Sequence, residues 1–191
     1  MRVAKWDVVT DRVTLDRDTE VDRDLVLHPG AVGIVALDDD EQVTLIRQYR
    51  HPVAAELWEI PAGLLDEPGE PPLATAQREL IEEVGLTASR WRTVIDLYSS
   101  PGMSSETIRV FLAQDLAEVD PAIRPEPTDE ERDLIVRRVP LEAAVDRVMA
   151  GDIHNSLAVA ALMATAEFRR REWKGLLPPD HPWPGPSWPV G

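Results

Sequence analysis

Three glutamates near the middle of the chain have a spacing that could support chemistry. Glu79, Glu82 and Glu83 stand at positions i, i+3 and i+4, so on a helix their carboxylates share one face. Like charges placed in this way repel, at roughly 0.2 to 0.5 kcal/mol per pair, which a solvated helix face tolerates. Carboxylate oxygens are also the ligands that hard cations prefer. The spacing therefore indicates either a divalent metal site or an acidic, exposed helix surface.

The neighbours of these glutamates favour the metal site. Arg78 can pair with one of the carboxylates and so reduce their repulsion. The expected helix follows a loop rich in proline, residues 64–72, whose backbone could supply further oxygen ligands. Such a set of donors suits Mg²⁺ or Mn²⁺.

The three glutamates are part of a longer pattern of fixed positions. The pattern comprises Gly63, Glu70, Arg78, Glu79, Leu80, Glu82, Glu83, Gly85 and Leu86. It resembles the Nudix box, G-x5-E-x7-R-E-U-x-E-E-x-G-U, in which U is an aliphatic residue. The spacing is complete from Glu70 onwards, but six residues instead of five separate Gly63 from Glu70. Because surface loops tolerate insertions, we expect an altered turn near Pro68 and Gly69 and an intact metal site.

Segments outside the box resemble one branch of this family, the ADP-ribose pyrophosphatases. Pro101 follows the box where that branch carries a proline, and residues 47–50, 59–63 and 151–155 are also similar to it. The likeness covers roughly residues 28–168. It implies an α/β fold, an α/β/α sandwich with a mixed sheet, preceded by a small N-terminal antiparallel β-region that helps to build a homodimer.

The resemblance also implies a reaction, the Mg²⁺-dependent hydrolysis of ADP-ribose to AMP and ribose 5-phosphate, with Mn²⁺ as a second possible cofactor. Hydrolysis of a pyrophosphate needs neutralised phosphate charge and a water made nucleophilic, and divalent ions supply both. The resemblance makes Glu79 and Glu83 the principal metal ligands. It makes Glu82 a bridging or water-mediated ligand with a catalytic role, and Ala62 a ligand through its carbonyl oxygen.

A general base is expected outside the box, because the three glutamates there are committed to metal. In the branch that the chain resembles, this base lies on a late acidic loop, and residues 129–134 fit that position. Glu130 aligns best, with Glu131 as the near alternative. A solvated acidic loop without a catalytic role is the competing interpretation.

Four further residues are candidates for binding the substrate. Arg50 and, less favoured, Arg47 carry planar guanidinium groups that can pair with phosphate or ribose oxygens. Glu59 precedes the box, and Glu106 lies in the turn after Pro101, where it could bind substrate or orient the turn. The competing interpretation for each is a polar side chain that does not touch the substrate.

Several elements must position these residues. Alternation of apolar and charged residues predicts two or three short strands in residues 3–28, a hairpin of residues 31–37 and 42–49 at the centre of a sheet, and a strand at residues 56–60. The pattern further predicts strands at residues 91–97, 107–113 and 134–139 and helices at residues 73–84, 141–150 and from Asn155 or Ser156 to about Trp173. We expect an N-terminal β-region (1–28), a hydrolase domain (29–174) and an extended tail rich in proline and tryptophan (175–191).

The composition excludes several classes of function. The chain has 191 residues and no cysteine, which excludes disulfides, thiolate catalysis and iron–sulfur clusters. Its net charge of −15 repels nucleic acids and anionic membranes, so neither is an expected partner. Residues 1–7 lack an apolar signal core, and the longest stretch of low charge, residues 156–166, is too short to span a bilayer. We expect a cytoplasmic enzyme with a small nucleotide substrate.

Three alternatives remain open. The substrate could be another nucleoside diphosphate sugar or a dinucleotide, such as GDP-mannose, FAD or NADH. A sensor that binds ADP-ribose without cleaving it is less consistent with the chain, because all three glutamates are present and no basic helix-turn-helix is seen. The C-terminal tail could also serve as a ligand for a partner protein, in addition to catalysis.

Overall fold

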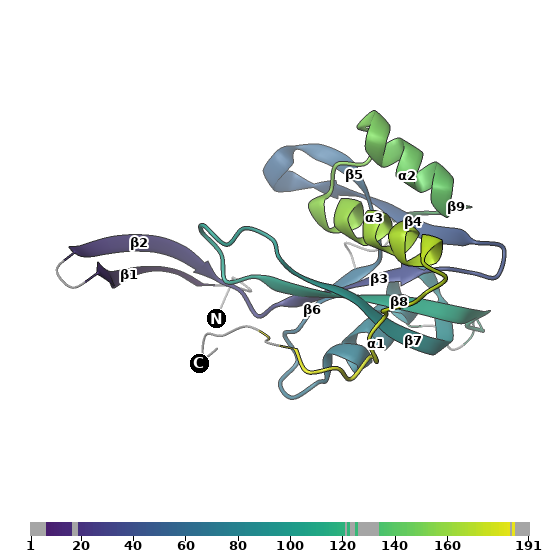
Figure 1. Ribbon diagram of the computed structural model, residues 1–191, viewed down its shortest axis with the longest axis horizontal. Coiled ribbons are helices and arrows are strands. Elements are labelled where there is room, and N and C mark those ends of the chain that lie inside the picture. Colours follow the sequence, from purple (N-terminus) through teal and green to yellow (C-terminus); the bar gives the residue numbers. More distant parts are fainter. Residues whose placement is uncertain are drawn as a thin grey trace.

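The computed structural model describes residues 7–16, 19–120, 122, 125, 134–183 and 185. In chain order the elements are β1 (Asp7–Asp16), β2 (Thr19–Leu27), β3 (Ala31–Ala36), β4 (Gln42–Arg50), the short 3₁₀ helix η1 (His51–Val53), β5 (Ala55–Glu59), β6 (Ala62–Leu64), α1 (Pro72–Val84), β7 (Leu86–Tyr98), β8 (Thr107–Glu118), β9 (Ile135–Pro140), α2 (Leu141–Ala150) and α3 (Ser156–Arg170). Figure 1 shows a body with α1 on one side of the strands and α2 and α3 on the other, from which the β1–β2 hairpin projects.

Two sheets form the body. Four strands pair in the order β6-β3-β8-β7, with β3 parallel to β8 and the other two pairs antiparallel. Three further strands pair antiparallel in the order β5-β4-β9. The expected α/β/α sandwich with a mixed sheet is therefore confirmed.

The prediction of a central hairpin from residues 31–37 and 42–49 was wrong in one respect. The turn forms, because Asp38 accepts hydrogen bonds from the amides of Asp40 and Gln42, but only Leu37 and Val43 bridge the two strands. Beyond that bridge the two strands belong to different sheets. β3 is an inner strand of the four-stranded sheet, and β4 is the central strand of the three-stranded sheet. Both faces are buried in β3 and in residues 43–46 of β4, which explains why these stretches are largely apolar. Such a pattern does not reveal which strand pairs with which.

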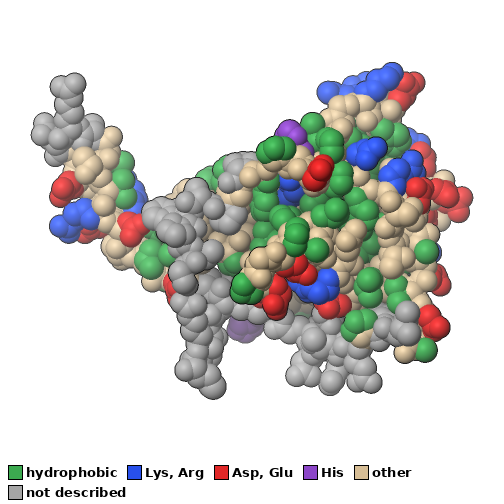
Figure 2. Space-filling view, turned by 90° about the horizontal axis from the view of Figure 1, so that it is seen from below, with side chains coloured by type: hydrophobic (Ala, Val, Ile, Leu, Met, Phe, Trp, Pro, Cys, Tyr) green, Lys and Arg blue, Asp and Glu red, His purple; other side chains and the backbone are tan. Residues whose placement is uncertain are grey.

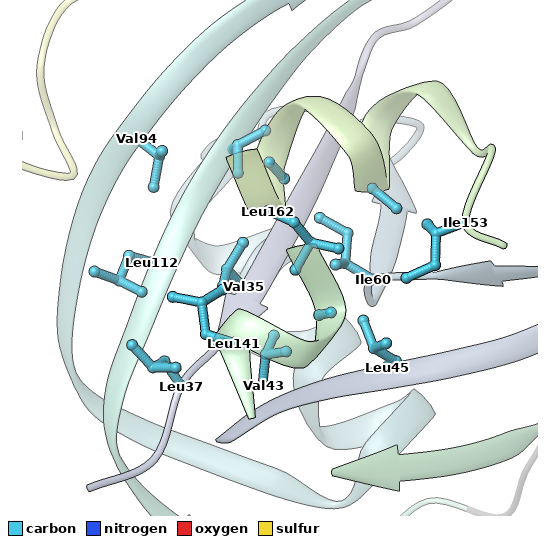
Figure 3. Packing of buried hydrophobic residues seen from close by; sticks show 14 residues of the cluster. Val35, Leu37, Val43, Leu45, Ile60, Val94, Leu112, Leu141, Ile153 and Leu162 are labelled. Atoms are coloured by element: carbon cyan, nitrogen blue, oxygen red, sulfur yellow. The ribbon is translucent and has the colours of Figure 1, made fainter. Parts of the chain in front are cut away.

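Two apolar clusters fill the layers. One lies between the sheets and the pair α2 and α3, as Figure 3 shows with Val35, Leu112 and Leu162. The other lies between α1 and the mixed sheet and contains Ala76 and Leu80 from the buried face of the helix. In the described part of the chain, no helix is both long enough and apolar enough to cross a membrane.

The helices follow the sequence prediction closely. The α1 helix ends at Gly85, which adopts a left-handed conformation (φ 67°) and donates its N–H to carbonyl oxygens of the last turn. Asn155 caps α3 by accepting the N–H of Ala158, which decides between the two candidate caps. The α3 helix ends at Arg170, about one turn before the expected end at Trp173.

The N-terminal region forms two antiparallel strands, within the expected number, and they are longer than the sequence predicts. Its strands pair along their whole length, from Asp7 opposite Leu27 to Asp16 opposite Thr19. The hairpin carries apolar side chains among charged ones (Figure 2), and Val8 is 74% and Leu15 58% exposed. It joins the body where Val26 exchanges backbone hydrogen bonds with Met103 and Ser105.

The start of the C-terminal tail packs against the body. Leu177 and Thr93 exchange two backbone hydrogen bonds, so the tail continues the sheet at the edge of β7. Arg109, on β8, has a side chain that is only 3% exposed, forms a bidentate pair with Asp96 and donates to the carbonyl oxygen of His181. The tail thus covers the buried guanidinium of Arg109.

Candidate active site

Arg78, in the middle of helix α1, forms hydrogen bonds with three glutamates. Its Nη1 donates to Glu79 at 2.8 Å and to Glu82 at 2.9 Å, while its Nε and Nη2 donate to the two oxygens of Glu70 at 3.3 and 3.1 Å. The sequence predicts a pair with one carboxylate, and the structure gives three. The guanidinium therefore offsets the mutual repulsion that the spacing of the glutamates creates.

These contacts shift the pKa values of both partners. The pKa of Arg78 is raised, first by its hydrogen bonds with Glu70 and then by the nearby charges of Glu79 and Glu82. The pKa of Glu70 is lowered by hydrogen bonds from Arg78 and from the Thr75 hydroxyl, which lies 2.8 Å away. Glu70 thus stays ionised at neutral pH and anchors Arg78 beside the helix.

Strand β6 lies directly against the same face of α1. A Cβ atom at Gly63 would fall on Cγ, Cδ and Oε1 of Glu79, closer than real Cβ atoms approach other atoms. One residue earlier, the N–H of Ala62 donates to Oε2 of Glu83 at 3.0 Å. The absence of a side chain at Gly63 therefore lets the backbone of β6 and the carboxylates of α1 meet.

The oxygen donors around β6 and α1 suit a hard divalent cation. Glu79, Glu82 and Glu83 project from one helix face, and the backbone of Ala62 lies beside Glu83. Among the residues that the structure describes, no group of three histidine, aspartate or glutamate side chains already lies close enough together to hold a metal ion. Mg²⁺ commonly keeps several waters and binds proteins through one or two carboxylates, so an open, all-oxygen donor set of this kind fits it.

The extra residue before Glu70 is accommodated in a tight turn. Glu70 donates its N–H to the carbonyl oxygen of Glu67, and Gly69 inside that turn has a positive φ of 81°. Glu70 still reaches Arg78 and Thr75, so the insertion leaves the ion-pair network of α1 intact.

A second charged pair joins β4 to β5. Glu59 is buried, with a side chain only 4% exposed, and it accepts two hydrogen bonds from Arg50, at 2.9 and 2.6 Å. Gln48 adds a longer contact at 3.4 Å. The buried carboxylate of Glu59, three residues before Ala62 in the chain, therefore fixes the direction of the Arg50 guanidinium, which remains partly exposed.

Arg47 lies on the same strand pair but in different surroundings. It forms an ion pair with Glu56 at 2.5 Å, and its guanidinium carbon stacks 5.9 Å from the centre of the Trp58 ring. Both members of this ion pair are substantially exposed. Exposed pairs of this kind contribute little to stability, so Arg47 can exchange this partner for another anion at small cost.

Glu106 lies immediately before β8, in the turn that joins β7 to β8. Its carboxylate accepts a very short hydrogen bond from Ser99, and its Oε1 lies 3.5 Å from Nε2 of His28. Sequence reasoning proposed Glu106 as a candidate but left out His28, because none of the four histidines has the spacing of a metal ligand. The contact joins residues far apart in the chain, so no local pattern could have revealed it.

The structure brings the candidates together in groups. Ala62, Glu79, Glu82 and Glu83 form one group around β6 and α1, Arg50 and Glu59 form a second, and Glu106 with His28 forms a third. The candidates for the general base, Glu130 and Glu131, lie outside the described residues.

The chain resembles known proteins over most of its length. A family model described as NUDIX domain matches residues 27–158. An ADP-ribose pyrophosphatase from Mycobacterium tuberculosis is 48% identical over 154 residues, 81% of this chain and 73% of that protein. An ADP-ribose pyrophosphatase from Bacillus subtilis is 35% identical over 156 residues, 82% of each chain.

A solved structure supports the same assignment. The crystal structure of an ADP compounds hydrolase superposes with a TM-score of 0.67 at 25% identity, covering 90% of this chain and 98% of that one. The family model spans both the catalytic candidate helix α1 and the strand β6 that packs against it. The chain therefore belongs to the Nudix hydrolase family.

Proposed function

We propose that the protein hydrolyses ADP-ribose to AMP and ribose 5-phosphate with the help of Mg²⁺. The observation that carries this proposal is the packing of Gly63 against Glu79, which puts a strand backbone beside a helix face with three carboxylates. The relatives from two bacteria, both named ADP-ribose pyrophosphatase, support the choice of substrate.

Glu79, Glu82, Glu83 and the carbonyl oxygen of Ala62 are the proposed ligands of the cation. When bound, a divalent cation neutralises phosphate charge and makes a water more acidic. Mn²⁺ has similar ligand preferences and could replace Mg²⁺. Arg78 would hold Glu79 and Glu82 in place through the hydrogen bonds described above.

The chain's other polar groups would bind and orient the substrate. Arg50, held by Glu59, would donate to oxygens of the pyrophosphate, and Arg47 would add a second positive charge from the same strand. Glu106 would accept hydrogen bonds from sugar hydroxyls, because an ionised carboxylate is an acceptor only. Fixing the substrate in this way keeps the reacting phosphorus in line with the attacking water.

Glu130 or Glu131 is the proposed general base that takes the proton from this water. Replacing each in turn by glutamine keeps its size and removes its basicity. We expect one of the two variants to lose turnover by about 100-fold or more while its KM stays near the wild-type value. If both variants keep wild-type turnover, the base lies elsewhere.

The choice of substrate is tested by comparing kcat/KM for ADP-ribose, GDP-mannose, FAD and NADH under the same metal concentration. ADP-ribose is expected to give the highest value. A higher value for GDP-mannose or a dinucleotide would keep the chemistry and change the specificity. Tight binding of ADP-ribose without cleavage of any compound would instead support the sensor.

A homodimer is the proposed assembly, with the β1–β2 hairpin contributing to the interface. The hairpin has exposed apolar residues, among them Val8, Val13 and Leu15, and it projects from the body (Figure 1). Burying these side chains against a second copy would stabilise both. Sedimentation that shows only monomer at micromolar concentration would contradict this assembly. The cytoplasm stays our prediction for the location of the enzyme.

A further inference from the structure

His28 occupies the joint between the projecting hairpin and the body. Its side chain is almost fully buried, and its residue is only 9% exposed. Its backbone N–H donates to the Ser105 hydroxyl at 2.8 Å, and the adjacent turn is fastened to Val26 by two backbone hydrogen bonds. The imidazole is therefore held between the end of β2 and the turn that carries Glu106.

The contacts of the ring determine which nitrogen carries its proton. Nδ1 of His28 accepts a hydrogen bond from the N–H of Gly30 at 3.1 Å, so Nδ1 carries no proton. In the neutral ring the proton is then on Nε2, which faces Oε1 of Glu106 at 3.5 Å. Burial lowers the pKa of His28, and the charge of Glu106 offsets only part of this effect, which favours the neutral ring.

Each carboxylate oxygen of Glu106 faces one polar hydrogen of a neighbouring side chain. The Ser99 hydroxyl donates to Oε2, and the Nε2–H group of His28 faces Oε1. The amide of Glu106 also donates to the Ser104 hydroxyl at 3.1 Å. Each carboxylate oxygen can accept more than one hydrogen bond, and the side chain is 25% exposed, so it can still accept hydrogen bonds from a ligand.

This cluster is connected to the proposed catalytic site through the sheet. The carbonyl oxygen of Gly30 accepts the N–H of Leu65, which follows β6 directly. The next residue, Ala31, lies opposite Leu64 of β6 and Ile108 of β8. Glu106 is thus two residues before the row in which Ala31 pairs with Leu64 and Ile108, and this row is next to the one that contains Gly63.

We propose that His28 is a positioning residue that, together with Ser99, holds the carboxylate of Glu106 in the orientation that accepts hydroxyl groups of the substrate's sugar. The proposal rests on the function proposed above, since it assigns Glu106 to the sugar of a nucleoside diphosphate sugar. His28 itself touches no substrate. Its contribution is the restricted orientation of Glu106, which removes part of the ordering cost that binding would otherwise impose.

Two substitutions separate this role from a purely structural one. In His28→Asn, the shorter side chain can still accept the N–H of Gly30 in an Asx turn, but it no longer reaches Glu106. In His28→Gln, the longer amide can still donate to Glu106. We expect His28→Asn to raise the KM for ADP-ribose about 5- to 10-fold with kcat within twofold of wild type, and His28→Gln to restore most of this loss.

Coupling to Glu106 is tested by repeating the substitution in a Glu106→Gln background. If His28 acts through this carboxylate, His28→Asn should cause little further change in KM there. His181→Asn, in which an exposed histidine of the tail is changed, is the matched control and should keep wild-type kinetics. An equal rise in KM in both backgrounds, or no rise in either, would overturn the proposal.

The position of the ring proton gives a readout that does not depend on activity. Nitrogen-15 NMR of the histidine side chains should show His28 as the neutral ring with its proton on Nε2, and Glu106→Gln should shift that Nε2 signal. A proton on Nδ1 would overturn the proposal. Failure of the proposed function is distinguishable, because in that case the wild-type protein leaves ADP-ribose intact, whatever the state of His28.

Discussion

Glu79 and Gly63 pack so closely that the α-carbon of the glycine takes up the space beside the glutamate side chain. Any Cβ atom at residue 63 would overlap Cγ, Cδ and Oε1 of Glu79. The φ angle of Gly63 is not in the left-handed region, so the glycine is required here by space and not by backbone conformation. This contact determines where a proposed metal ligand stands relative to β6.

The first prediction concerns this contact. Gly63→Ala should displace the carboxylate of Glu79 and lower kcat about 100-fold, because a shift of the order of 1 Å in a catalytic group can have that effect. Steady-state kinetics with ADP-ribose measure the change. The control is Gly102→Ala, since a Cβ atom there meets no atom within 4 Å and the residue has no positive φ. Equal activity in the two variants would contradict the importance of the close packing.

The second prediction concerns pH and Glu70. Its pKa is lowered in the folded protein by hydrogen bonds from Arg78 and Thr75, so the stability it contributes is present above its unfolded-state pKa of about 4.3. That stability is lost as the pH falls through the lower, folded-state pKa. Urea unfolding should therefore show wild type more stable than Glu70→Gln at pH 7, with a smaller difference at pH 3.

An exposed neighbour provides the control for this experiment. Glu67→Gln removes the same charge from the same turn, and Glu67 contributes to that turn through its backbone carbonyl. It should match wild type in stability at pH 7. A difference between wild type and Glu70→Gln that is the same at both pH values would argue that the ionised carboxylate is not the stabilising group.

The third prediction compares two charge pairs that link β7 and β8. Arg109→Ala removes a buried guanidinium that pairs with Asp96 and donates to the tail, so we expect a loss of about 2 kcal/mol in the free energy of unfolding. Arg90→Ala breaks an exposed pair with Asp115 and should cost less than about 1 kcal/mol. Denaturant unfolding of both variants checks the difference. Similar losses in the two variants would mean that neither the contact with the tail nor the burial of Arg109 adds to the free energy of unfolding.

The sequence predicts the helix α1 and its acidic face because these depend on local spacing. The i, i+3 and i+4 positions of the glutamates, the apolar residues such as Leu80 and the terminal Gly85 all lie within one helix. Strand β6 was not predicted. It has only three residues, begins directly after Pro61 and contains Gly63, so it shows no periodicity, and it is a strand because β3 lies beside it.

Contacts between distant parts of the chain were also not predictable. Arg78 was expected to pair with one carboxylate, but Glu70 reaches it only because the loop before α1 folds back over the helix. The contact between His28 and Glu106 depends on how β2 meets the turn before β8. Charge and residue type mark such groups as candidates, and tertiary structure decides which of them meet.

The most direct test of the proposed function is product analysis after incubation of the protein with ADP-ribose. Chromatography should show AMP and ribose 5-phosphate when Mg²⁺ is present, and neither product when the metal is removed by a chelator. The Glu83→Gln variant, which loses a carboxylate beside Ala62, should form product at least about 100-fold more slowly. Product formed at the same rate without metal, or by Glu83→Gln, would contradict a metal-dependent reaction at α1.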